Sequence, residues 1–163
     1  MLHSSIAIEH LSYNIYMAKT FRKRNPGSTR RNMNMKKFQK DIAIKFIEIL
    51  MMVKLYHWRT TSYATHKATD ELYTSLNEHI DKFIEVLLGK AGNRIEVIGP
   101  KSFSLKDIDS QDKLKRLIEG FKGYLVGLNN NKTIGIMSNS DLLNIRDEIL
   151  GDLNQFLYLL TFK

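Results

Sequence analysis

The stretch that decides the fold is Tyr56–Glu85, YHWRTTSYATHKATDELYTSLNEHIDKFIE, which holds three of the five histidines and the only tryptophan. From about Tyr63 onward its apolar residues recur at helical spacing, which predicts one long amphipathic helix. The residues that define this apolar face are Leu72, Leu76, Ile80, Phe83, Ile84 and Leu87. The candidate chemistry and part of the candidate core therefore belong to a single helix.

A polar face runs along the same helix. At about 100° per residue, His66, Asp70, Asn77, Asp81 and Glu85 fall within a sector of roughly 100°. His66 with Asp70, and Asp81 with Glu85, are pairs one turn apart, and each pair has donors that can bind one metal ion. The helix rises about 16 Å from Asp70 to Asp81, at ~1.5 Å per residue, so the two pairs do not meet on one chain. An antiparallel second copy brings them together about a two-fold axis, which predicts a dimer. The alternative is an ordinary solvated helix face.

Three further helices are indicated by apolar periodicity, at about 36–59, 105–128 and from Ser138 or Ser140 to about Leu160. Thr61 or Ser62 is expected to cap the helix that follows. Pro100 interrupts the chain between the second and third helices, and a turn is expected at 129–131. The predicted fold is all-α, an antiparallel four-helix bundle at 36–163. A short helix at about 3–19 and a basic linker make up the N-terminal extension, residues 1–35.

The basic segment, residues 21–37, surrounds a Pro26-Gly27-Ser28 sequence that suggests a turn. Its cations are Arg22, Lys23, Arg24, Arg30, Arg31, Lys36 and Lys37, and the whole chain has a formal charge of +8. Such a segment is suited to contact phosphates, so DNA or another polyanion is a predicted partner. The alternative is a solvated linker that favours solubility.

Composition excludes several kinds of site. The chain has no cysteine, which rules out disulfides, thiol catalysis and Cys-ligated zinc. Any metal site must use His, Asp and Glu, which suit iron, manganese, zinc or magnesium. No segment is apolar enough for a signal peptide or a membrane span, so we expect an intracellular protein without a membrane partner.

The His57-Trp58 pair at the end of the first helix, His66 with Asp70, and Asp81 with Glu85 together form a pattern that resembles Dps-type, ferritin-like proteins. The last helix, DLLNIRDEILGDLNQFLYLL, is also similar to the final helix of that family. The resemblance covers roughly residues 36–162. The link from His57 to His66 is about three residues shorter than in typical Dps chains. The segment HWRTTSYATHKA also resembles a divergent ferritin-like group of large DNA viruses and phages.

The resemblance implies an iron site of the ferroxidase type between two subunits. His57, His66 and Asp70 would come from one subunit, and Asp81 and Glu85 from its two-fold mate. Such a site oxidises Fe(II) with peroxide or oxygen, which would make the protein an enzyme. The resemblance further implies a dodecameric shell, iron storage and association with DNA in the nucleoid.

Two other functions remain open. The chain is alternatively a non-catalytic ferritin-like structural or interaction protein, such as a virion or minor capsid component. A DNA-compacting protein without catalysis is the third interpretation. Trp58 is expected to anchor the core or a dimer interface, and His79 to have a surface or packing role.

Overall fold

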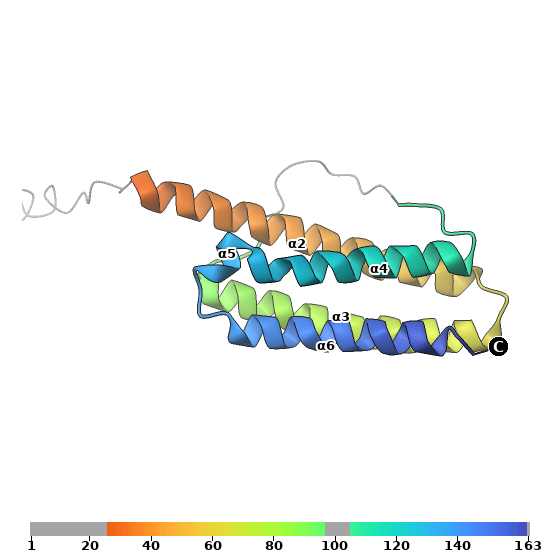
Figure 1. The fold of residues 1–163 in the computed structure, drawn as a ribbon. Coiled ribbons are helices and arrows are strands. Elements are labelled where there is room, and N and C mark those ends of the chain that lie inside the picture. Colours follow the sequence, from red (N-terminus) through yellow and green to blue (C-terminus); the bar gives the residue numbers. More distant parts are fainter. Residues whose placement is uncertain (1–25, 97–104, 163) are drawn as a thin grey trace, which may run out of the picture. The chain divides into compact units, whose positions relative to one another are not determined.

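In the computed structural model, which describes residues 26–96 and 105–162, every regular element is a helix (Figure 1). The elements are α2 (Pro26–Arg59), α3 (Tyr63–Ala91), α4 (Gln111–Gly127), the 3-10 turn η1 (Leu128–Asn130), α5 (Lys132–Gly135) and α6 (Ser140–Leu159). The all-α prediction is therefore confirmed. The helix expected at about 3–19 lies outside the described residues.

By its contacts the chain divides into two units, 1–33 and 34–163, and the packing described below concerns the second. None of the helices in the described ranges is both long enough and apolar enough to cross a membrane.

Helix α2 is longer than the sequence predicts. It begins at Pro26, so residues 26–37 are helical and the expected linker is wrong over that range. Proline is well tolerated in the first turn of a helix, because the amide hydrogen that it lacks would have no partner there. The Pro26-Gly27-Ser28 sequence thus starts a helix instead of forming a break.

Helix α3 begins at Tyr63, as predicted, and both of its ends are capped. The Ser62 hydroxyl accepts a hydrogen bond of 3.3 Å from the amide of Thr65, as expected for a capping serine. Gly92 ends the helix with a φ of +64°, and its amide donates to the carbonyls of Leu88 and Gly89. Only glycine adopts this left-handed conformation without cost.

Helix α4 begins six residues later than predicted. Ser110 caps it by accepting a hydrogen bond from the Lys113 amide, and residues 105–110 are not helical. The predicted turn at 129–131 contains the end of η1, and α5 follows it. Asn131 caps α5 by accepting hydrogen bonds from the amides of Thr133 and Ile134 at 2.9 and 3.3 Å.

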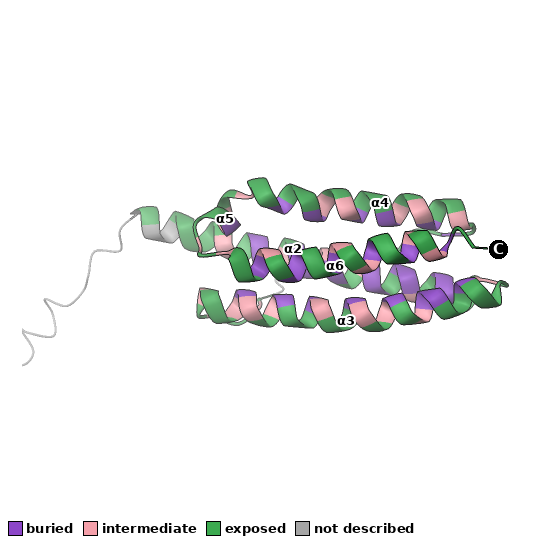
Figure 2. Ribbon diagram, turned by 60° about the horizontal axis from the view of Figure 1, so that its bottom comes forward, coloured by how far each residue is buried: buried purple, intermediate pink, exposed green. Residues whose placement is uncertain are grey.

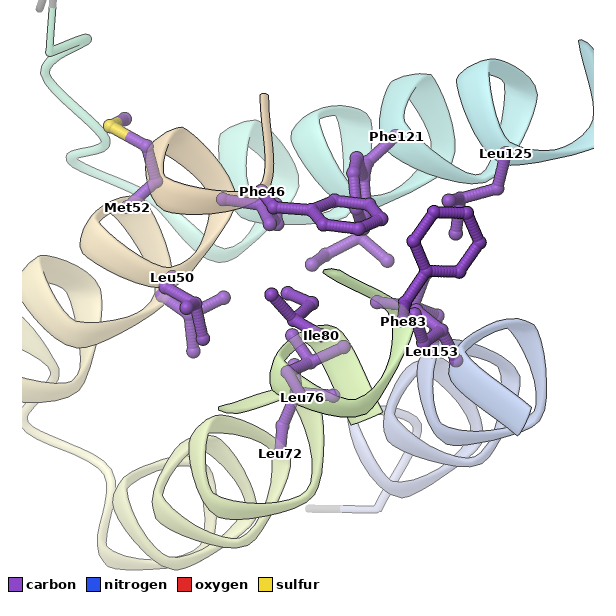
Figure 3. Close-up of a cluster of buried hydrophobic side chains, with 14 of the residues drawn as sticks. Phe46, Leu50, Met52, Leu72, Leu76, Ile80, Phe83, Phe121, Leu125 and Leu153 are labelled. Carbon is purple, nitrogen blue, oxygen red and sulfur yellow. The ribbon is translucent and has the colours of Figure 1, made fainter. Parts of the chain in front are cut away.

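The four long helices meet in one apolar core (Figure 3). Phe46 of α2 is fully buried and contacts Phe83 of α3 and Phe121 of α4 edge-on, with ring centroids 5.3 and 6.1 Å apart. Figure 2 shows that buried and exposed residues alternate along each helix, as amphipathic periodicity requires.

Polar contacts fix the directions of neighbouring helices. Lys90 lies 2.8 Å from Asp141, and His79 lies 2.7 Å from Asp152, so α3 and α6 run antiparallel. Arg146 of α6 is buried and donates to the carbonyl oxygen of Leu125, near the end of α4, at 3.1 Å. These contacts join α6 to both of its neighbours.

Candidate metal centre

The last turn of α2 and the first turn of α3 bring two histidines face to face. Nδ1 of His57 lies 3.1 Å from the carbonyl oxygen of His66, and Nδ1 of His66 lies 3.1 Å from the carbonyl oxygen of His57. The two rings stack with centroids 3.9 Å apart and an interplanar angle of 24°. Because a carbonyl only accepts, Nδ1 carries the hydrogen in both rings. When the ring is neutral, Nε2 keeps its lone pair.

Thr69 holds His57 in place. Its side chain is fully buried, and Oγ1 lies 3.2 Å from Nδ1 of His57. The same hydroxyl donates to two carbonyl oxygens, that of Thr65 at 2.8 Å and that of His66 at 2.9 Å. The imidazole of His57, itself buried, is therefore oriented by two neighbours. Burial also raises the pKa of the adjacent phenol, Tyr56, above its ordinary value.

Asp70 supplies a carboxylate beside these rings. Its Oδ1 lies 3.9 Å from Nε2 of His57 and 3.5 Å from the ammonium nitrogen of Lys54. The same ammonium lies 4.8 Å from the centre of the Tyr73 ring. Asp70 thus already has a cationic partner, and the side chain of Lys54 is 26% exposed against 51% for Asp70. Sequence reasoning missed Lys54 and Thr69.

The other two predicted ligands lie further along α3. Asp81 and Glu85 are exposed, and no side-chain hydrogen bond or ion pair joins them to another described residue. Within one chain, no three His, Asp or Glu side chains of the described ranges form a group able to hold a metal ion. The structure therefore gathers His57, His66 and Asp70, and leaves Asp81 and Glu85 apart from them.

The side chains predicted to bind anions differ in exposure and in whether they form ion pairs. Arg30 and Arg31 are exposed on α2. Lys36 instead lies 2.8 Å from Glu96, and Lys37 lies 3.0 Å from Asp41, so part of their charge is balanced. The remaining predicted cations, Arg22, Lys23 and Arg24, lie outside the described residues.

His79 and Trp58 lie in different surroundings. His79 packs between α3 and α6, where Nδ1 lies 2.7 Å from Asp152 and Nε2 lies 3.9 Å from Glu148. Trp58 is 69% exposed in the single chain. The core alternative for Trp58 is therefore wrong, because the residue points away from the buried side of α2, and the dimer-interface alternative stays a prediction.

Comparison with known proteins gives two matches. The chain is 39% identical over 56 residues to an uncharacterized 14.6 kDa protein from the mobD-ri intergenic region of Enterobacteria phage T4. That alignment covers 32% of this chain and 44% of the phage protein, so the chain matches less than half of its relative's length. No solved structure matches. The second match is a family model that covers residues 57–160 and names neither Dps nor ferritin. Because this match spans well over half of the sequence, the chain belongs to DUF5856, a family of unknown function.

Proposed function

We propose that this protein binds a divalent transition metal ion between two copies of the chain, and that this ion is Fe(II). His57, His66 and Asp70 of one copy and Asp81 and Glu85 of the other would hold the ion as cargo. The observation that carries the proposal is the reciprocal bonding of the two histidines, each with Nδ1 directed at the other's carbonyl oxygen. In protein metal sites, ligating imidazoles are commonly oriented in this way.

The donor set fits iron. Neutral imidazole nitrogens and carboxylate oxygens are ligands that Fe(II), Mn(II) and Zn(II) accept. Nε2 of His57 lies on the Asp70 side of the ring, 3.9 Å from the carboxylate. Lys54 is the feature that opposes binding, because its ammonium lies 3.5 Å from the same carboxylate oxygen. An incoming cation must replace this ammonium as the partner of Asp70.

Bound iron would supply one-electron redox chemistry, in which oxygen or peroxide oxidises Fe(II). The protein's own part is to hold the two imidazoles in one orientation and one tautomer and to supply carboxylates. A single chain lacks a complete ligand group among its described residues. Asp81 and Glu85 from a second copy would therefore complete the site, in keeping with the two-fold arrangement predicted from their spacing.

The helix order supports a ferritin-like four-helix bundle as the scaffold. His57–His66 and Phe46–Phe83 contacts make α2 and α3 an antiparallel hairpin. Contacts of Phe46 with Phe121 and of Arg59 with Asp107 make α4 antiparallel to α2 as well. Helices α3 and α4 therefore run in the same direction, as two helices joined by a crossover connection do. A bundle with one long crossover connection is the ferritin-like arrangement.

The test is an anaerobic Fe(II) titration of the full chain by calorimetry, followed by addition of oxygen or peroxide. We expect saturable binding in the wild type that is lost in both His66→Ala and Asp81→Ala, and iron oxidation faster than in protein-free buffer. Asp112→Ala is the matched control, because Asp112 is an exposed carboxylate on α4. Binding no stronger than that of an unrelated basic protein would refute the proposal.

A second candidate function is attachment to nucleic acid, as in a phage particle or nucleoid. It is favoured by the exposed Arg30 and Arg31, the formal charge of +8 and the relative from phage T4. Neutralising phosphates releases counterions, so binding to duplex DNA should fall steeply with salt. Replacing both arginines with alanine should reduce the slope of log K against log salt by roughly two. An unchanged slope would exclude these two residues as phosphate ligands.

A further inference from the structure

Helix α2 carries a line of apolar side chains on its outer side. Ile47, Met51, Leu55 and Trp58 are 41%, 40%, 39% and 69% exposed, and they follow one another at intervals of four, four and three residues. That spacing keeps them on one face of a helix. Since α2 buries another face in the core, these four residues, the α2 stripe, form a second apolar face that the other described residues leave partly exposed. Aligned apolar side chains of this kind mark an interaction surface more often than scattered ones do.

The α2 stripe borders the candidate metal centre. Lys54 lies between Met51 and Leu55 in sequence, and its ammonium contacts both Asp70 and the Tyr73 ring. The flank of α2 beside the stripe is thus the flank that touches the polar face of α3. The two helices present one continuous outer face, apolar on α2 and polar on α3.

The register of the two helices points to the partner. On α3, residues 75 and 76 lie midway between His66 and Glu85 and also between Asp70 and Asp81. A two-fold axis that joins the two ligand pairs must therefore pass at that level. The Lys54–Tyr73 and Phe46–Phe83 contacts place the same level close to Met51 on α2. Met51 is also the midpoint between Ile47 and Leu55. The polar and the apolar patterns are therefore centred at one height, although they lie on different helices.

Lys54 and the two exposed carboxylates of α3 place opposite charges toward the two ends of this face. Lys54 and His57 lie toward one end, where Asp70 has Lys54 as its partner. Asp81 and Glu85 lie toward the other end and are exposed. A copy turned by the two-fold axis sets the carboxylate end of one chain against the lysine and histidine end of the other, twice.

We propose that the α2/α3 face binds a second copy of this chain, antiparallel, with the two Met51 side chains meeting at the two-fold axis. In this arrangement Ile47 of each copy packs near Leu55 of the other. The inference deepens the proposed function, on which its register partly rests, because it names the surface that would bring Asp81 and Glu85 to the site. The apolar contact at Met51 holds the pair together whether or not a metal is bound.

The absence of cysteine from the chain allows a direct test. Under mild oxidation, full-length protein carrying Met51→Cys should form a disulfide-linked dimer. Leu55→Cys alone should not, because four residues from the axis in each chain separate the two sulfurs by about 12 Å along the helix, at ~1.5 Å per residue. A disulfide needs Cα atoms within roughly 7 Å. A mixture of Ile47→Cys and Leu55→Cys should cross-link as a heterodimer. Cross-linking of Leu55→Cys alone, or none with Met51→Cys, would overturn the proposed register.

The mass in solution tests the surface independently of the disulfides. We expect a wild-type dimer or an even-numbered assembly in equilibrium sedimentation, and at least a tenfold weaker association for Met51→Glu. The control is Val126→Glu, since Val126 is 52% exposed but lies on α4. A monomeric wild type, or equal association of Met51→Glu and wild type, would overturn the inference.

One further variant separates this inference from the proposed function. His66→Ala should lose metal binding while a Met51→Cys, His66→Ala double variant still cross-links. If Met51→Cys cross-links but wild type binds no iron, the dimer stands and the metal function fails. If wild type binds iron as a monomer, the dimer fails instead.

Discussion

Lys54 gives the sharpest prediction about the candidate metal centre, because removing it should strengthen metal binding. In Lys54→Met the apolar stem is kept and the ammonium 3.5 Å from Asp70 Oδ1 is lost. Both side chains are partly exposed, so the dielectric constant of water applies, and the lost attraction is about 1 kcal/mol at this distance. A cation that binds Asp70 no longer has to replace that attraction. Metal affinity should therefore rise roughly fivefold, since 1.4 kcal/mol corresponds to about tenfold.

The assay is calorimetric titration with Co(II) or Fe(II) under argon, with wild type, Lys54→Met and Lys45→Met in parallel. Lys45 is the matched control, because it is a lysine of α2 paired with Glu48 at 3.0 Å and is not among the contacts of Asp70. Both variants lose one positive charge, so a general charge effect would raise both affinities equally. Equal or weaker binding by Lys54→Met relative to Lys45→Met would refute the view that Lys54 competes with the metal for Asp70.

Three other outcomes follow from the fold. Phe46→Ala, which removes a fully buried ring, should lower the free energy of unfolding by about 3–5 kcal/mol in urea denaturation, and a loss below 1 kcal/mol would contradict its central place in the core. Arg146→Met removes a buried guanidinium that donates to Leu125, and should cost about 2–4 kcal/mol in the same assay. The hydrogen bond from Lys90 holds the pKa of Asp141 below its ordinary value of 3.8. The stabilisation by this pair is therefore present above that pH and is lost as pH falls through the lowered pKa. The urea midpoint of Asp141→Asn should accordingly change less than that of wild type between about pH 5 and pH 2, and parallel curves would argue against the pair.

The Arg146 site shows why its cost is not simply the sum of its contacts. Its guanidinium bonds the Leu125 carbonyl and the Asn129 side chain, each at 3.1 Å. Its Nε lies 2.7 Å from Asp147 Oδ1, at ion-pair distance but without hydrogen-bond alignment. Methionine preserves most of the apolar volume. The Leu125 carbonyl keeps the hydrogen bond from the Leu128 amide in the variant, so the measured loss reports chiefly on the two hydrogen bonds that the guanidinium donates.

Periodicity in the sequence predicts the helices well where one face is buried. The bounds of α3 follow from Leu72, Leu76 and Ile80, which are all buried, and from the capping residue Ser62. The start of α4 is not predictable in this way. Leu105 and Ile108 continue an apolar pattern, yet they precede Ser110, and capping by its hydroxyl sets the helix start. Local capping chemistry therefore outweighs the apolar pattern at that end.

The candidate site is predictable only in part, since most of its contacts join α2 to α3. The i, i+4 spacing of His66 and Asp70 is visible in the sequence. The bonding of His57 with His66 depends on the three-residue connection that sets α2 against α3. The contact of Lys54 with Asp70 depends on the rotation of α2 about its axis. Neither the connection's geometry nor that rotation is encoded in residue spacing.

The proposed metal site and the alternative interaction function would use the same surface in different ways. The α2 stripe and the polar face of α3 are adjacent, so a partner on one of them affects the other. If the partner is a second copy, Asp81 and Glu85 reach the histidines and a metal site results. If it is another protein of a phage particle, the ion pair between Lys54 and Asp70 remains intact. The stacked pair of His57 and His66 then serves only to hold α2 against α3. Met51→Glu should weaken either assembly at least tenfold, whereas His66→Ala should remove only metal binding. The pair of variants therefore decides between the two functions, and neither variant does so alone.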